Sequence, residues 1–335
     1  MRNLRVAVVG LGRIGKVHLE TLLRRTAGVE VISVWDPRSA KAEEAARSGG
    51  IPSVGKSFSE ILEADVDAVI LCSPTDTHTE YVIAAARAGK HIFCEKPLAL
   101  SLAEIRDAIA AVEAAGVQLM VGYNRRFDPN HSKARQMVET GKIGAPHLLK
   151  ITSRDPAPPP PEYCAVSGGM FLDMTIHDFD LARYVMGSEV KEVFARATSL
   201  VDERIGQSGD VDTAVITLDF ENGAIGVIDN SRRAVYGYDQ RLEVFGSAGM
   251  VQIDNTRHDT HEFFGAEGTQ RALLHDFFMD RYREAFAVEM GAFVESIRMG
   301  REVPVTGHDG LLSVAIALAA KKSVADNRPV HIDEV

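Results

Sequence analysis

Three side chains able to carry out acid–base chemistry stand close together in the second half of the chain. Asp173 and His177 are four residues apart, and Asp180 follows three residues later. On a helix this spacing places all three along one face. A carboxylate beside an imidazole orients the ring and favours its cation, which suits a base that takes a proton from an alcohol. A solvated Asp/His pair on a helix surface has the same spacing, so the pattern needs support from elsewhere.

That support comes from Lys96, in the motif Glu95-Lys96-Pro97 after a strand-like run around Phe93. Ligands of open α/β sheets bind outside the carboxyl ends of the strands, where this motif falls. An ammonium group there can donate to a substrate oxygen and stabilise alkoxide character while hydride leaves the same carbon. Lys96, Asp173 and His177 are therefore the predicted catalytic residues of a hydride-transfer site.

The cofactor motif is Gly10-x-Gly12-x-x-Gly15, directly after an apolar strand-like run and opening a helix. In that context glycines permit a tight turn, and a pyrophosphate can sit on the helix N-terminus. Asp36 ends the second strand-like run, 21 residues beyond Gly15, where a carboxylate can accept bonds from both hydroxyls of the adenosine ribose. Asp36 favours NAD, and Arg38, which could hold a 2′-phosphate, keeps NADP open as the alternative.

Two turns after later strands are expected to flank the nicotinamide half of the cofactor. They are Ser73-Pro74-Thr75, with His78 just inside the following helix, and Glu95-Lys96-Pro97. Plain β-to-α turns have a similar composition, and position in the sheet favours the functional reading. The predicted cofactor-binding residues are Gly10, Gly12, Arg13, Ile14, Gly15, Asp36, Arg38, Ser73, Thr75, His78, Glu95 and Lys96.

The pattern of elements predicts two α/β domains. Residues 1–122 alternate short β-branched runs with helical stretches, which indicates a doubly wound Rossmann domain with a parallel sheet. Residues 123–335 are expected to form an α/β domain with an open-faced, largely antiparallel sheet. Expected there are helices at 129–140, 170–185, 275–298 and 307–325, a proline-rich loop at 156–161, strands at 190–199, 211–220, 224–231 and 240–253, and a type I′ turn at Asn222-Gly223.

Composition excludes several classes of protein. Of 335 residues 45% are hydrophobic and 25% charged, as in globular proteins, and a net charge of −10 is the wrong sign for neutralising nucleic-acid phosphates. Three cysteines without C-x-x-C spacing favour a reducing, cytoplasmic setting. No apolar run reaches the ~20 residues that span a bilayer, and no targeting segment or metal site is expected.

In order and spacing, the glycine motif, Asp36, Glu95-Lys96-Pro97 and Asp173-x-x-x-His177 resemble the Gfo/Idh/MocA oxidoreductase family over almost the whole chain. Residues 151–156, 170–180 and 231–246 are most similar to the branch that acts on inositol. The resemblance implies NAD-dependent oxidation of the axial C2 hydroxyl of myo-inositol to scyllo-inosose in inositol catabolism. It implies His177 as base, Asp173 orienting it, and Lys96 at the reacting hydroxyl.

The resemblance also implies the substrate contacts and the assembly. The implied polyol contacts are Lys96, Arg125, Asp155, Asp173, His177, Asp180 and Tyr236, with Thr175 a weaker candidate, and the assembly is a homotetramer packed through the open sheet. Some relatives carry His where this chain has Ser153 and Asn where it has Asp155. Two alternatives stay open. One is a dehydrogenase of the same family that acts on scyllo-inositol or a sugar, and the other is a non-catalytic regulator that binds a dinucleotide.

Overall fold

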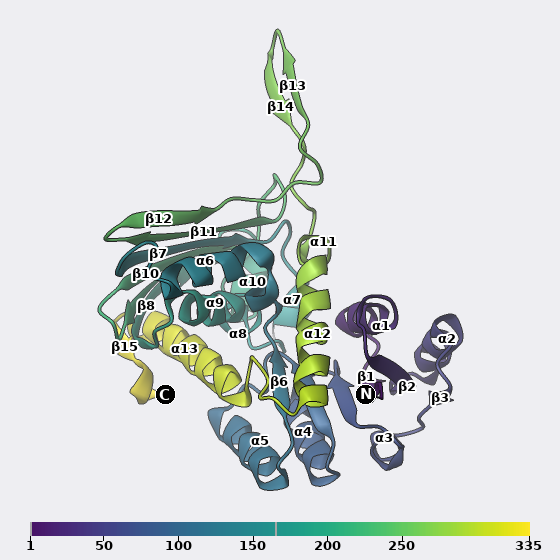
Figure 1. Ribbon diagram of the computed structural model, residues 1–335. Helices are drawn as coiled ribbons and strands as arrows, with labels where there is room; N and C mark the ends of the chain where they lie inside the picture. Colours follow the sequence, from purple (N-terminus) through teal and green to yellow (C-terminus); the bar gives the residue numbers. More distant parts are fainter. Residues whose placement is uncertain (1, 165) are drawn as a thin grey trace. The chain divides into compact units, whose positions relative to one another are not determined.

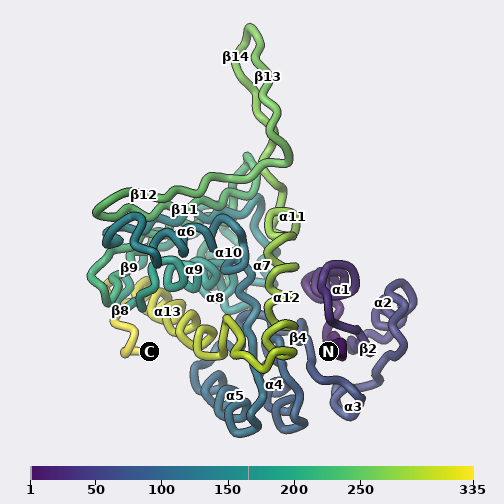
Figure 2. Tube along the Cα trace, viewed as in Figure 1, coloured from purple at the N-terminus to yellow at the C-terminus, as the bar shows by residue number. Residues whose placement is uncertain are grey.

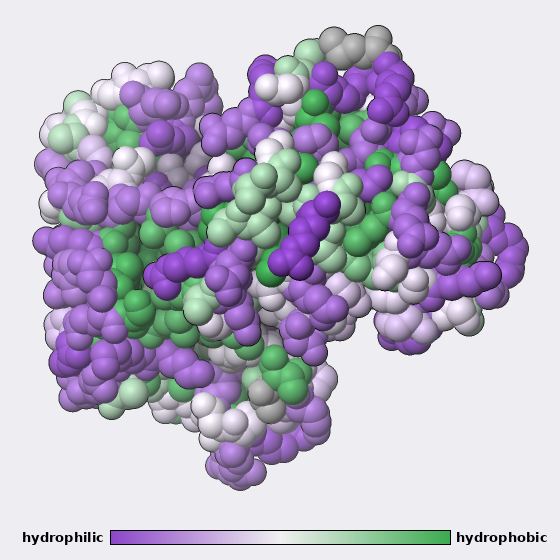
Figure 3. All heavy atoms as spheres, turned by 90° about the horizontal axis from the view of Figure 1, so that it is seen from below, coloured by the Kyte–Doolittle hydropathy of each residue, from purple (hydrophilic) through white to green (hydrophobic). Residues whose placement is uncertain are grey.

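The computed structural model describes residues 2–164 and 166–335 and divides them into two compact units. The first unit comprises residues 1–127 and 284–314, and the second comprises residues 128–283 and 315–335. Figure 1 shows the elements of both, coloured along the chain. Figure 3 shows that hydrophilic residues cover much of the face drawn there, as expected for a chain in which a quarter of the residues are charged.

The first unit is built on a six-stranded parallel sheet with the strand order β3-β2-β1-β4-β5-β6. Both faces of its central strands are covered, so Val6, Val8, Ile92 and Phe93 are fully buried. The strands are β1 (Leu4–Val9), β2 (Val29–Trp35), β3 (Ser53–Val54), β4 (Ala68–Leu71), β5 (His91–Glu95) and β6 (Leu119–Gly122). The helical segments of this part are α1 (Arg13–Arg25), α2 (Ser39–Gly49), α3 (Phe58–Glu63), η1 (Thr75–Thr77), α4 (His78–Arg87), α5 (Leu102–Ala115) and η2 (Asn124–Phe127). This confirms the predicted Rossmann domain.

A single domain boundary near residue 122 does not describe the chain, because a late segment returns to the first unit. Residues 284–314 carry most of α12 (Arg283–Met299) and the first turns of α13 (Gly307–Asp326). The segment before α13 covers the edge strand β6, where the Val121 amide donates to the Val305 carbonyl at 3.1 Å. The late segment is held in the first unit because it pairs with the otherwise open edge of the sheet. No local sequence pattern indicates this pairing.

The second unit contains a seven-stranded sheet with the order β12-β11-β7-β10-β9-β8-β15. All its pairs are antiparallel except β10 with β7. The strands are β7 (Pro146–Arg154), β8 (Val190–Thr198), β9 (Thr213–Phe220), β10 (Ile225–Ser231), β11 (Asp239–Gly246), β12 (Gly249–Ile253) and β15 (Val330–His331). The helical segments are α6 (Pro129–Glu139), α7 (Pro161–Cys164), α8 (Met170–Asp173), α9 (Ile176–Met186), α10 (Glu203–Gln207), α11 (Phe278–Arg281) and η3 (Ile332–Glu334). The open-faced, largely antiparallel sheet is confirmed.

A separate hairpin, β13 (Glu262–Gly265) with β14 (Gly268–Arg271), projects away from this sheet (Figure 2). This hairpin was not predicted from the sequence. No helix in the described part of the chain combines the length and the apolar character needed to cross a membrane.

The hairpin between β9 and β10 is present, but its turn is not type I′. That turn requires positive φ at both central residues, and Gly223 has a φ of +84° whereas Asn222 does not adopt one. The Gly223 amide donates to the Phe220 carbonyl and the Asn222 side chain accepts from the Ala224 amide, each at 3.0 Å. The loop is therefore a three-residue turn with glycine in the left-handed position.

Candidate active site

The turn between β1 and α1 is packed on one side and open on the other. A Cβ on Gly10, whose φ is +87°, would lie 2.6 Å from the Cys72 carbonyl oxygen, and one on Gly15 would lie 1.9 Å from the Gly10 carbonyl oxygen. A Cβ on Gly12, the N-cap of α1, would meet nothing within 4 Å. No side chain caps α1 and no acidic residue stands in its first turn. Open amides at a helix N-terminus, with room beside them, fit the pyrophosphate of a dinucleotide.

Asp36 is held rigidly at the end of β2. Its Oδ2 accepts the Leu11 amide at 2.8 Å, and its Oδ1 accepts the amide and Nε of Arg38, each at 2.9 Å. Burial alone raises the pKa of Asp36, but hydrogen bonds from Arg38 and Leu11 outweigh it and lower the pKa to about 2. Asp36 is therefore an ionised acceptor beside the glycine turn, and Arg38 is paired with it rather than free for a 2′-phosphate.

His78 ties together the two turns that were expected to flank the nicotinamide. Its Nδ1 lies 2.8 Å from the Pro97 carbonyl oxygen and its Nε2 lies 2.9 Å from that of Ser73. The ring is buried, and burial lowers its pKa although both carbonyl contacts raise it. Both ring nitrogens thus contact backbone carbonyls of the same unit, and the cofactor contact of His78 stays a prediction. The Thr77 hydroxyl donates to the Ser73 hydroxyl at 2.7 Å, and Thr75 begins η1 in the same turn.

Glu95 is occupied in the same way, and the residue that holds it is His18 of α1. Glu95 Oε1 lies 2.6 Å from His18 Nε2, and Oε2 accepts the Lys96 amide at 3.2 Å. A Cβ on Gly122 would lie 3.0 Å from the Glu95 carboxyl carbon, so glycine leaves room for this carboxylate. Glu95 thus contacts His18 and the Lys96 backbone, and its contact with a cofactor stays a prediction. The contact of His18 with Glu95 was not predicted. The one signal for it in the sequence was a histidine inside the helix that follows the glycine motif.

The predicted helix over 170–185 is wrong in one respect, because it is broken into α8 and α9. Met174 and Thr175 separate the two helices. The Thr175 hydroxyl donates to the Asn230 side-chain oxygen at 2.7 Å, and the Asn230 amide group donates to Asp178 at 2.9 Å. These buried bonds to β10 fix the start of α9 independently of α8. Asp173 ends α8 and His177 is the second residue of α9, so they do not share one continuous helical face.

Asp173 is joined to Asp155 through a buried arginine that the sequence analysis did not find. Asp173 Oδ1 accepts the Tyr163 hydroxyl at 3.0 Å, and Oδ2 accepts Arg232 Nη1 at 3.3 Å. The same Nη1 lies 4.0 Å from Asp155 Oδ2. Arg232 is 2% exposed. It is 59 residues from Asp173 in sequence, so no local pattern could have indicated the pair.

Asp180 lies elsewhere in the interior. It is 1% exposed, and its Oδ1 is 3.9 Å from Arg183 Nη1, while Arg183 Nε also binds Glu189 at 2.5 Å. The structure thus places Asp180, predicted as a polyol contact, in an ion-pair cluster at the middle of α9. Arg125, also predicted as a polyol contact, is buried in η2 of the first unit.

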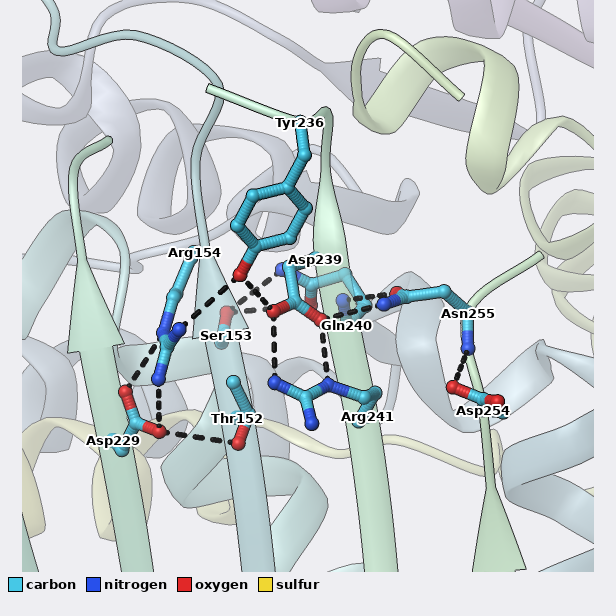
Figure 4. Close-up of polar contacts among 10 residues, drawn as sticks. All are labelled: Thr152, Ser153, Arg154, Asp229, Tyr236, Asp239, Gln240, Arg241, Asp254 and Asn255. Atoms are coloured by element: carbon cyan, nitrogen blue, oxygen red, sulfur yellow. Dashed lines mark hydrogen bonds and ion pairs between the residues drawn. The ribbon is translucent and has the colours of Figure 1, made fainter. Parts of the chain in front are cut away.

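Tyr236 belongs to a polar network on the open face of the sheet (Figure 4). Its hydroxyl donates to Asp239 at 2.6 Å and accepts from Arg154 at 3.2 Å, and Arg154 forms two bonds to Asp229. Side chains alternate along a strand, and Asn230 next to Asp229 faces α9. The Tyr236 hydroxyl therefore lies on the face opposite α9, apart from His177.

Each of the two units carries some of the predicted site residues. The first unit carries the glycine turn, Asp36 and Lys96, and the second carries Asp155, Asp173 and His177. In residues 2–164 and 166–335, no group of three or more His, Cys, Asp or Glu is arranged to hold a metal ion. The glycine turn and Asp36 are suited to a dinucleotide. The ammonium, carboxylate and imidazole groups are suited to bind hydroxyls and to transfer a proton.

Two family models match the chain. One, described as an oxidoreductase family with an NAD-binding Rossmann fold, matches residues 4–123, and the other, described as the GFO/IDH/MocA C-terminal domain, matches residues 131–252.

Known proteins align with the chain over nearly its full length. A myo-inositol 2-dehydrogenase of Thermotoga maritima is 50% identical over 99% of both chains. An inositol 2-dehydrogenase of Rhizobium meliloti is 44% identical over 98% of this chain and 99% of its own. A crystal structure of scyllo-inositol dehydrogenase from Lactobacillus casei, with bound NAD(H) and scyllo-inositol, is 29% identical with a TM-score of 0.92, covering 99% of this chain and 100% of that one.

Proposed function

The chain belongs to the Gfo/Idh/MocA family of oxidoreductases, and we propose that it oxidises the axial C2 hydroxyl of myo-inositol to scyllo-inosose with NAD. The observation that carries the proposal is the 50% identity to the Thermotoga maritima enzyme over the whole chain. Support comes from the residues, since Lys96, Asp173 and His177 are all present and the Asp36 carboxylate is fixed where NAD is preferred over NADP.

In the proposed reaction, the residues of this chain position the polyol and move one proton. NAD, when bound, accepts a hydride from the carbon that bears the reacting hydroxyl. The Lys96 ammonium donates to the oxygen of that hydroxyl and favours alkoxide character. His177 takes the hydroxyl proton on its imidazole, and Asp173 orients it. Glu95 and His18 keep the Lys96 backbone in place.

The substrate contacts in this proposal are weighted by what the structure shows of each side chain. Asp155 and Asp173 are carboxylates held together and suited to accept bonds from hydroxyls of a polyol. Arg125 remains a proposed contact from the first unit. Asp180 is paired with Arg183, and the Tyr236 hydroxyl is bonded to Asp239 and Arg154. We therefore propose that Asp180 and Tyr236 support the site rather than bind the polyol directly.

A second candidate is oxidation of scyllo-inositol, favoured by the likeness to the Lactobacillus casei enzyme crystallised with that cyclitol. The two cyclitols differ only in the configuration at one carbon, which a pocket discriminates by placing hydrogen-bond partners for each hydroxyl. A sugar dehydrogenase and a non-catalytic regulator are the further alternatives.

Formation of NADH at 340 nm tests the function. The purified protein is expected to reduce NAD with myo-inositol at mildly alkaline pH, faster than with scyllo-inositol or glucose, and faster than it reduces NADP. A preference for scyllo-inositol would establish the second candidate. A protein that binds NADH but oxidises no polyol would be the regulator instead.

The pH dependence tests the role of His177. A base must be deprotonated to accept the hydroxyl proton, so kcat/KM for myo-inositol should rise with pH through one ionisation. His177→Ala should lose both activity and this rise. The matched control is His147→Ala, because His147 is an exposed residue of β7. A native profile that is flat between pH 5 and 8 would count against His177 as base.

We also propose assembly as a homotetramer through the open sheet face. Cross-strand register aligns four apolar residues in one row on that face, Ile225, Leu148, Phe245 and Met250. All four are more than a third exposed. An aligned apolar row across four strands is the kind of surface that a second copy of the sheet covers. Light scattering on the eluting protein measures the mass, and a monomeric mass would contradict this proposal.

A further inference from the structure

Arg232, just past the end of β10, is a guanidinium surrounded by carboxylates in the second unit. Its Nη1 lies 3.3 Å from Asp173 and 4.0 Å from Asp155. Burial alone lowers the pKa of Arg232, but the carboxylates outweigh it, so the pKa is raised above its ordinary value. The titratable groups that act on Arg232 include Asp173, Asp155, Asp210 and Cys164, and the Tyr163 hydroxyl donates to Asp173.

The backbone fixes this arrangement from three directions. The Asp155 amide donates to the Ser231 carbonyl at 2.9 Å, and the Ala234 amide donates to the Asp155 carbonyl at 2.7 Å. The Arg232 amide donates to the Asp212 carbonyl at 2.8 Å. The ends of β7 and β10 are thereby locked together, so Asp155 and Arg232 are neighbours before any ligand binds.

The helix that carries Asp173 is anchored to the same cluster. Asp210 Oδ1 accepts the Met170 amide at 2.9 Å at the start of α8. A Cβ on Gly169 would lie 2.5 Å from that oxygen, so a side chain there would displace Asp210. Asp210 thus sets the start of α8, and Arg232 binds Asp173 at its end.

A buried ion pair of this kind contributes little net stability, because desolvation of both ions offsets their attraction. Its consequence lies in the two carboxylates. Without the guanidinium, the partly buried carboxylates of Asp155 and Asp173 would take up protons more readily and would lose their capacity as pure hydrogen-bond acceptors. With it, two ionised carboxylates stand side by side in a fixed geometry.

We propose that Arg232 is a positioning residue of the substrate site, which holds Asp155 and Asp173 together as one ionised pair that accepts hydrogen bonds from neighbouring hydroxyls of a polyol. This inference rests on the proposed function. It assigns recognition of a vicinal diol to the pair, with Arg232 acting through the carboxylates rather than on the substrate.

The test compares Arg232→Met with Arg233→Met, because Arg233 is the exposed neighbour in the same turn. Removing the buried cation takes away the attraction that favours the ionised carboxylates, so Asp155 and Asp173 should take up protons more readily. We therefore expect the acid limb of kcat/KM for myo-inositol to move up by about one pH unit and kcat/KM at pH 7 to fall about 10–100-fold. Arg232→Lys keeps the charge, so it should restore the position of the acid limb.

A second measurement does not depend on activity. In Arg232→Met the two carboxylates face each other without a cation between them, and protonation relieves their repulsion, so the variant should lose less stability at low pH than at high pH. The loss of Tm relative to Arg233→Met should therefore be larger at pH 7 than at pH 5. NADH affinity, which depends on the first unit, should stay within about twofold in every variant.

The outcomes separate the two proposals. If the unmodified protein oxidises no polyol, the proposed function is contradicted. If the Tm difference between Arg232→Met and Arg233→Met still grows with pH, the proposal that Arg232 holds an ionised carboxylate pair stands. Active protein whose Arg232→Met variant keeps both the native pH profile and a pH-independent Tm difference overturns the role of Arg232. If Arg232→Met does not fold, Arg232→Lys with a displaced acid limb would overturn it as well.

Discussion

Lys96→Ala is expected to lower kcat for polyol oxidation by about 10²–10³-fold, the loss typical of removing one donor to a developing oxyanion. The physical reason is that the Lys96 ammonium acts on the hydroxyl oxygen as negative charge accumulates there. NADH affinity should change little, because the glycine turn and Asp36 lie on other strands of the sheet. Stopped-flow or steady-state assays at 340 nm, with NADH binding followed by fluorescence, measure both quantities.

The control for this variant is Lys191→Ala, since Lys191 is an exposed lysine of β8. It should have native kcat and native NADH affinity. His18→Phe offers a further check, because it removes the partner of Glu95 that holds the Lys96 backbone. Near-native kcat in Lys96→Ala would remove Lys96 from the mechanism.

Asp36→Ser is expected to shift the preference from NAD toward NADP by about 10²-fold in kcat/KM, which corresponds to about 2.7 kcal/mol. The carboxylate that would repel a 2′-phosphate disappears. Arg38, whose side chain is 60% exposed and paired with Asp36, is released to bind that phosphate. The pKa of Asp36 is lowered to about 2, so in the native protein the preference for NAD should not vary between pH 6 and 10.

The double variant Asp36→Ser with Arg38→Ala is the matched control. It lacks the carboxylate and also the released guanidinium, so it should lose most of the gain with NADP. If the double variant uses NADP as well as Asp36→Ser does, then Arg38 has no part in the shift. An unchanged ratio of NAD to NADP in Asp36→Ser would contradict the role of Asp36.

The cofactor half of the site could be predicted from the sequence because its determinants are local. Gly10, Gly12 and Gly15 are required by one tight turn, and Asp36 ends the strand that pairs beside it. Residues so close along the chain are placed by turn and strand geometry, which short-range steric rules describe. The same rules predicted strand-like runs directly before the glycine motif and before Asp36, where β1 and β2 lie.

Predictions failed where distant hydrogen bonds competed with local preference. The sequence of residues 170–185 has a helical pattern throughout, yet bonds from Asn230 to Thr175 and Asp178 begin a new helix at Ile176. Strand β7 was not predicted, because Leu148 is exposed on the open face and Ser153 is buried on the other, so its sequence lacks a regular alternation of apolar and polar residues. A half-exposed strand in the middle of a sheet is stabilised by its neighbours, and they are far away in sequence.

The sequence by itself determined the two-domain α/β class and the glycine turn of the Rossmann domain, because each follows from local patterns of strands, helices and glycines. Only the tertiary structure decided what surrounds them. His18 meets Glu95 across 77 residues, and Arg232 meets Asp173 across 59. Such pairs form because folding buries charged groups, and a buried charge requires a partner that no local pattern specifies.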